Sequence, residues 1–212
     1  MAISEITFTG TNNIDEVLAW MHTNASEYFD DITKDGNTLN CSVNGAVFLQ
    51  VGFSGNATTG LTLPNGNNKT YSSSDSSANV TKVYKTDKGI ALFRDRYYDI
   101  FVSKTDEGST AVVMIFRAQS DDLRIYGADS ENSTDLSTYP SVKESIYNPG
   151  INAITKHFAT AGKAAIVPFV FDNGSHTPNI FLVPFSPFIG TKAIIDLDGT
   201  KYVYDGCIAL KE

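Results

Sequence analysis

The spacing of apolar residues changes along this chain, from the period of a helix to the period of a strand. Between Asn13 and Ile32 apolar side chains recur every three or four positions, which predicts an amphipathic helix. Asn13 suits the N-cap position, and Glu16 follows three residues later as in a capping box. Asp35 and Gly36 supply a stop signal. We therefore expect one helix that begins at Asn13 and ends at Ile32.

The apolar stripe of this helix has two interpretations. In the first, the helix covers one face or one end of a sheet. In the second, the stripe is a docking or self-association surface, although its heptad-like run is too short for a stable coiled coil. The residues that would carry the second interpretation are Val17, Trp20, Met21 and Tyr28.

After the helix, short apolar runs alternate with turn residues, as is typical of antiparallel strands. Asn44-Gly45 predicts a two-residue hairpin turn, and Asp198-Gly199 and Asp205-Gly206 each predict a hairpin corner near the chain end. Between residues 79 and 116, four runs separated by polar turns predict a four-stranded meander. Its last run, from Val112 to Phe116, is apolar on both faces and should be a central strand. Two further strands, broken by Pro-Phe, are expected at 164–171 and 179–188.

Three segments are harder to interpret. Residues 64–78 indicate an exposed loop with a short strand at 69–71, and residues 128–139 indicate a second polar loop. Residues 139–162 fit either a short helix or a loop. Neither loop divides the chain, so we expect one domain over residues 1–212. Residues 1–36 would form an N-terminal strand and the helix, and residues 37–212 an antiparallel β body. The expected fold is mainly β, an antiparallel sandwich or barrel-like domain with the helix packed on it.

Composition supports a β-rich fold and excludes several partners. The chain has 212 residues, of which only 19% are charged, and its polar surface is built from 16 Asn, 19 Ser and 21 Thr. The net charge is −8 and there is no basic cluster, so we expect no nucleic-acid binding and no binding to anionic membranes. No apolar run has the length of a membrane span, and the N-terminus has no signal-peptide pattern. We expect Cys41 and Cys207 to be buried free thiols.

The sequence offers little chemistry. None of its three histidines, His22, His157 and His176, lies in a zinc-binding spacing, and no phosphate-binding loop occurs, so we expect no metal and no cofactor. Asp172, Ser175 and His176 are the residue types of a hydrolase triad, but an Asx-rich turn explains them better, because triad members must converge in space. We therefore expect no catalytic residue.

Tyrosines are the remaining candidates for ligand contact. Several lie in or beside predicted turns, where an exposed ring could stack on a sugar. The alternative is that each ring is half-buried on a strand. The candidates are Tyr97, Tyr98, Tyr126, Tyr139 and Tyr147.

The end of the chain resembles a known group of proteins. An aromatic-Pro-Phe strand is followed by a short ending with two Gly turns and a Leu-Lys pair, as in small virion-associated proteins of tailed phages and prophages of Gram-positive bacteria. The helix followed by an Asn-Gly hairpin is also similar to that group, whereas Cys207 and Ile208 depart from it, because an aromatic residue is usual there. The matching positions are Pro184, Phe185, Ile195, Asp198, Gly199, Tyr202, Asp205, Gly206, Leu210 and Lys211.

This resemblance implies a non-enzymatic structural subunit of a virion. Such a protein would be made in the host cytoplasm, released by lysis, and held in the particle as a homo-oligomer that contacts other virion proteins. The alternative is a carbohydrate- or receptor-binding module that uses loop tyrosines to hold a host cell-surface glycan.

Overall fold

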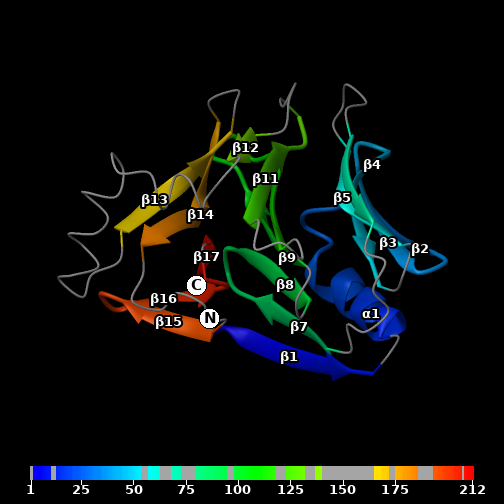
Figure 1. Ribbon diagram of the computed structural model, residues 1–212, viewed down its shortest axis with the longest axis horizontal. Helices are drawn as coiled ribbons and strands as arrows, with labels where there is room; N and C mark the ends of the chain where they lie inside the picture. The colour runs from blue at the N-terminus through cyan, green and yellow to red at the C-terminus, as the bar shows by residue number, and fades with distance from the viewer. Residues whose placement is uncertain are drawn as a thin grey trace.

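The computed structural model describes residues 2–10, 13–53, 57–62, 68–72, 80–94, 98–117, 123–131, 137–139, 165–171, 175–185, 193–206 and 208–212. In these residues the chain forms one helix and three antiparallel sheets (Figure 1). The expected fold class, mainly β and antiparallel with a single N-terminal helix, is confirmed.

A seven-stranded sheet lies at the centre of the molecule, and we call it the central sheet. Its strand order is β1-β7-β8-β9-β10-β11-β12. The four strands β7 to β10 are consecutive neighbours, so the predicted meander is confirmed. The strands are β1 (Ser4–Thr9), β7 (Val80–Lys85), β8 (Gly89–Arg94), β9 (Tyr98–Lys104), β10 (Thr110–Arg117), β11 (Leu123–Asp129) and β12 (Ser137–Tyr139).

Two five-stranded sheets complete the fold. The N-terminal sheet has the order β2-β3-β4-β5-β6, and the C-terminal sheet the order β13-β14-β17-β16-β15. The N-terminal sheet contains β2 (Asp31–Asp35), β3 (Thr38–Val43), β4 (Ala46–Gly52), β5 (Thr58–Thr62) and β6 (Asn68–Ser72). The C-terminal sheet contains β13 (Ala165–Val170), β14 (His176–Phe185), β15 (Ala193–Leu197), β16 (Thr200–Tyr204) and β17 (Ile208–Lys211).

The central sheet separates two apolar cores (Figure 1). On one side it faces the helix and the N-terminal sheet across what we call the helix-side core. On the other side it faces the C-terminal sheet across what we call the C-terminal core. In β10, Val112 and Met114 enter the first core, while Val113 and Ile115 enter the second. Because successive residues of a strand point to opposite faces, a strand between two cores must be apolar throughout.

The helix is shorter than the spacing predicted. Helix α1 spans Ile14–Asn24, and Ile32 lies instead in strand β2. Near the helix end, the Thr23 hydroxyl donates to Ala19 O at 3.1 Å and the Asn24 amide donates to Trp20 O at 2.9 Å. Such side-chain bonds compete with the backbone ladder and favour termination. Tyr28 lies in a turn and Ile32 in a strand, but both side chains are buried in the same core as the helix. Their spacing therefore extends the apolar pattern of the helix beyond its end.

Two of the three predicted Gly turns have the expected geometry. Asn44 and Gly45 have φ of 54° and 76°, and Asp198 and Gly199 have φ of 53° and 83°. Positive φ at both central residues is the mark of a type I′ hairpin. The turn at Asp205 is different, because its backbone N–H donates to Ile208 O at 3.2 Å and its Oδ1 accepts from Ile208 N at 2.7 Å.

The predicted loops have mixed outcomes. The polar loop expected at 128–139 is wrong at both ends. Strand β11 runs to Asp129 and buries Ala128 and Asp129 completely, and β12 begins at Ser137. The strand expected at 69–71 is confirmed as part of β6. Residues 140–162 lie outside the described residues. Within the part of the chain that the structure describes, no helix is long and apolar enough to cross a membrane.

Candidate functional site

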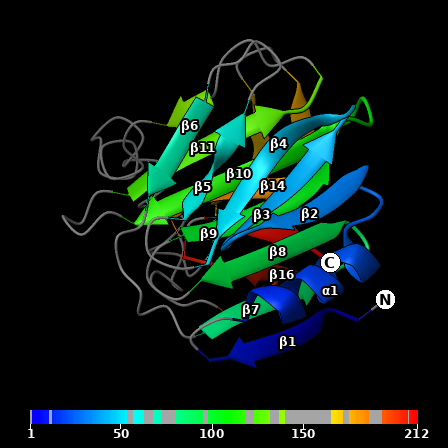
Figure 2. The same ribbon diagram turned by 90° about the vertical axis from the view of Figure 1, so that its right-hand side faces the viewer.

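The four residues predicted as a docking face are buried inside the protein. Val17 is fully buried, Met21 is 2% exposed, Tyr28 is 4% exposed and Trp20 is 8% exposed. All four belong to the helix-side core, so α1 covers the central and N-terminal sheets (Figure 2). The interpretation of this stripe as a docking face is therefore wrong, and the interpretation as a sheet cover is correct.

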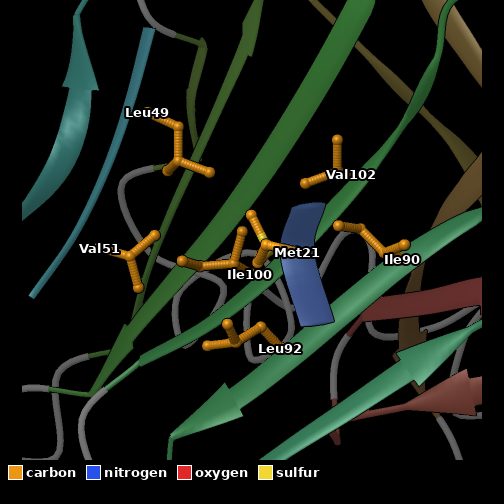
Figure 3. A pocket seen from close by; sticks show the side chains of 7 residues that line it. All are labelled: Met21, Leu49, Val51, Ile90, Leu92, Ile100 and Val102. Atoms are coloured by element: carbon orange, nitrogen blue, oxygen red, sulfur yellow. The ribbon is translucent and has the colours of Figure 1, made fainter. Parts of the chain in front are cut away.

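A small cavity lies at the centre of the helix-side core (Figure 3). Its volume is about 10 Å³, roughly the space that one water molecule requires. Every lining side chain is apolar, so a water would find no hydrogen-bond partner there. The cavity is a packing gap rather than a ligand site. It is lined by Met21, Leu49, Val51, Ile90, Leu92, Ile100 and Val102.

Two of the five candidate tyrosines can be placed. Tyr98 is 2% exposed, and its hydroxyl donates to Gly52 O at 2.5 Å, so its ring cannot stack on a ligand. Tyr126 is half-buried, with its ring edge-on to Phe116 at a centroid distance of 5.6 Å. Tyr97 and Tyr147 lie outside the described residues, as does the side chain of Tyr139.

One buried polar cluster joins the start of α1 to the central sheet. Asn13 Oδ1 accepts from Thr81 Oγ1 at 3.1 Å and from Arg94 Nη1 at 3.4 Å, while its amide donates to Phe8 O at 3.2 Å. Arg94 is 3% exposed, and Nη2 donates to Phe53 O at 3.0 Å. The sequence predicted that the Asn13 side chain caps the helix, and this prediction is wrong. The side chain instead anchors the start of α1 to β7 and β8.

A second buried polar cluster surrounds Asp129. Its Oδ1 accepts from Ser109 Oγ at 2.6 Å and from the Glu131 N–H at 2.9 Å, and its Oδ2 accepts from Ser175 Oγ at 2.9 Å. Ser109 Oγ also lies 2.8 Å from Thr105 Oγ1. The cluster ties the central sheet to the residue that precedes β14. Sequence reasoning missed it because Asp129 sits in a polar stretch that reads as an exposed loop.

Two residues of the triad-like set, Ser175 and His176, contact different carboxylates. Ser175 is bound to Asp129, whereas His176 Nδ1 lies 3.2 Å from Asp106 Oδ2. The backbone strengthens the second pair, since the Asp106 N–H donates to His176 O at 3.1 Å. Asp172 lies outside the described residues. These contacts connect the β9–β10 turn and β11 to the C-terminal sheet, and they bring no imidazole to the Ser175 hydroxyl.

Metal and thiol chemistry are equally restricted in the described residues. They contain no group of three or more His, Cys, Asp or Glu side chains that could hold a metal ion. Cys41 is a free thiol that is fully buried, and burial raises its pKa far above the ordinary value. Cys207 lies outside the described residues.

The exposed apolar side chains point to the edges of the sheets. Among the described residues, the large hydrophobic side chains that are exposed are Ile6, at 41%, and Ile194, at 40%. Ile6 lies on β1 at one edge of the central sheet, and Ile194 lies on β15 at one edge of the C-terminal sheet. Unpaired edge groups can bind another strand, so natural edges are usually protected.

Most of the other edges carry such protection. Strand β12 has only three residues, and β13 contains Pro168 and two register irregularities. In β2, three of five residues are charged, and Lys34 is held by Asp15 at 2.6 Å. Short length, Pro, bulges and charge all disfavour further strand pairing.

Strand β1 has the least protection. It is six residues long, has neither Pro nor Lys, and pairs with β7 without a register shift. Five of its six residues are exposed, and among the described strands β7 is its partner (Figure 2). Its single charge, Glu5, is bound by Lys82 at 3.1 Å. The candidate functional site is therefore the edge of β1 that faces away from β7, which no described strand occupies.

Comparisons with known proteins add no further assignment. The chain matches no protein-family model, no curated protein and no solved structure.

Proposed function

We propose that this protein is a non-enzymatic structural subunit of a tailed-phage virion, which works by protein–protein contact in an oligomeric assembly. The observation that carries the proposal is the outer edge of β1, which no described strand pairs with, and on which the exposed Ile6 lies; an edge of this kind can accept a further strand. A sheet edge binds through backbone groups and so recognises another chain rather than transforming a small molecule.

The buried polar side chains of the protein support a structural role rather than a catalytic one. The polar clusters around Asn13 and Asp129 bond the helix and the C-terminal sheet to the central sheet. Buried hydrogen-bonded networks of this kind rigidify a fold and favour one arrangement of its layers. A subunit that repeats in a symmetric particle needs a fixed shape, because its contacts recur in every copy.

The C-terminal resemblance supports the location. Several matching positions have a structural role here, since Asp198 and Gly199 form the β15–β16 turn and Tyr202 and Leu210 are buried in the C-terminal sheet. The glycan-binding alternative loses support at Tyr98, whose ring is enclosed in the helix-side core.

The proposal is tested on particles of the phage or prophage that encodes the chain. Particles purified on a density gradient should contain the protein in a fixed ratio to the major capsid protein, measured by quantitative mass spectrometry. Antibodies against the recombinant protein should label one location on the particle by electron microscopy. Recovery of the protein only from the soluble fraction of the lysate would overturn the proposal. A glycan array with the recombinant protein separates it from the alternative, which requires reproducible binding to a cell-wall sugar.

A further inference from the structure

We propose that β1 pairs antiparallel with β1 of a second copy of this chain, Thr7 opposite Thr7, so that the two central sheets become one continuous sheet. This inference deepens the proposed function and rests on it, because it names the partner and the strand. The pairing depends on which side chains of the two β1 strands lie opposite each other in this register.

The register is limited by the pleat of the strand. Residues that lie opposite each other in one sheet must point to the same face, so Ile6 can face Ile6 or Phe8 of the second copy but not Thr7. In the Thr7–Thr7 register, Ile6 faces Phe8 twice, once on each side of the two-fold axis. Phe8 is already half-buried against the helix-side core, so the exposed Ile6 would gain an apolar neighbour that is held in place.

The charges also suit this register. Glu5 lies opposite Thr9 of the second copy, so the two carboxylates are separated by four residues, or about 13 Å along the strand. Each carboxylate already has Lys82 of its own chain at 3.1 Å. Like charges directly opposite each other would disfavour pairing, and this register avoids them.

The other exposed edge fits a second copy less well. Strand β15 is one residue shorter than β1, and Asp196 stands two residues after Ile194. If β15 pairs with itself about Ile195, each Ile194 faces Asp196, so an apolar side chain meets a carboxylate. If it pairs about Ile194, the two Ile194 side chains meet, but only residues 193–195 of each strand lie opposite one another. The paired surface of β1 is isologous, and a contact of that kind closes at a dimer.

Cysteine cross-linking tests the register directly. In the proposed pairing the two Thr7 Cβ atoms lie about 4.5–5.5 Å apart, close to the separation that a disulfide requires. The Thr7→Cys variant should therefore form a covalent dimer under mild oxidation. Thr9→Cys is the matched control, because it is exposed on the same face of the same strand but would lie about 13 Å from its counterpart. Equal cross-linking of both variants, or of neither, would overturn the pairing.

A non-covalent measurement accompanies the cross-link. Ile6→Lys places two ammonium groups in the paired surface and changes a residue that is 41% exposed, so the monomer should still fold. Sedimentation equilibrium should show a dimer for the unmodified chain and at least about a tenfold higher dissociation constant for Ile6→Lys. A dimer that Ile6→Lys leaves unchanged would also overturn the pairing. In that case, weaker association of Ile194→Lys would identify β15 as the site.

The β1 pairing and the virion assignment can fail separately. A protein that is found in particles but does not cross-link at Thr7 refutes only the β1 pairing. A protein that cross-links at Thr7 but is absent from particles refutes only the virion assignment.

Discussion

The buried amide of Asn13 is shared by three partners from different parts of the fold. Its oxygen accepts from Thr81 and Arg94, and its nitrogen donates to the carbonyl of Phe8. Asn13 stabilises the fold mainly by accepting from buried donors. Leaving a buried donor without an acceptor costs more free energy than a typical hydrogen bond contributes to stability.

Replacing Asn13 with Ser separates this role from helix capping. Ser is as good an N-cap as Asn, so a capping residue would tolerate the change. The shorter side chain cannot reach Thr81 and Arg94 together, and we expect a loss of about 1–3 kcal/mol in the free energy of unfolding. Urea denaturation measures the difference.

Asn24→Ser is the control for this prediction. Asn24 is half-buried, and its side chain donates one hydrogen bond, to Trp20 O, within the described part of the chain. The change should therefore cost less than about 1 kcal/mol. Equal stabilities of the Asn13→Ser protein and the unmodified protein would contradict the buried-network role.

Gly127 lies where the central sheet packs tightly against phenylalanine rings on the side of the C-terminal sheet. A Cβ on this residue would lie 2.3 Å from Phe169 Cε1 and 3.1 Å from Phe171 Cε1. We expect Gly127→Ala to lower the free energy of unfolding by about 1–3 kcal/mol, because both rings are buried and would have to shift to admit the methyl group. Thermal and urea unfolding measure the loss. In a Phe169→Leu background the same change should cost less, and an undiminished cost there would show that the strain lies elsewhere.

At the level of elements, the strands were predictable and the end of the helix was not. Strands such as β10 have a continuous apolar run because both faces are buried, and Asn44-Gly45 and Asp198-Gly199 fix their turns by positive φ. These signals are local. The end of α1 and the burial of Asp129 depend on residues distant in sequence, including Ser175, and no local spacing reveals them. The edge of β1 needed the strand order, because the sequence does not say which strand lies outermost.

The role of α1 as a sheet cover can be tested at Met21. This side chain is 2% exposed and borders the small cavity of the helix-side core. Met21→Ala would enlarge that cavity, and we expect it to destabilise the fold by about 2–5 kcal/mol without weakening the self-association of the folded protein. Unfolding by urea and sedimentation equilibrium measure the two effects. His22→Ala, on the exposed side of the same helix, should change stability by no more than about 0.5 kcal/mol. Normal stability with lost association would restore the docking interpretation.

At the level of the whole molecule, the three layers are held by two cores that both contain buried tyrosines. Tyr28 and Tyr98 lie in the helix-side core, and Tyr84 lies in the C-terminal core. Burial raises the pKa of each phenol above its ordinary value, and raises that of Tyr98 to about 12. Both cores therefore favour the neutral phenol, so alkaline conditions should act on all three layers together.

The sign of the resulting pH dependence follows from linkage. In the unfolded chain Tyr98 titrates near its ordinary pKa of 10.0, whereas in the folded protein it stays protonated up to about pH 12. Below pH 10 the contribution of Tyr98 to stability is fully present, and between pH 10 and about 12 it declines, because only the unfolded chain can release the proton. The decline from this residue alone amounts to roughly 2–3 kcal/mol. Tyr28 and Tyr84 add to it in the same direction.

Urea unfolding at a series of pH values, with tyrosinate absorbance recorded on the folded protein, measures this decline. Tyr98→Phe should be less stable at neutral pH, because Gly52 O loses its donor, but its stability should fall less steeply above pH 10. The folded protein should also show fewer tyrosinates at pH 11 than the urea-unfolded chain. If Tyr98→Phe loses stability as steeply as the unmodified chain, Tyr98 ionises as readily in the folded protein as in the unfolded chain. The ring would then be open to water, and the layers around it would be less closely packed than the burial of Tyr98 requires.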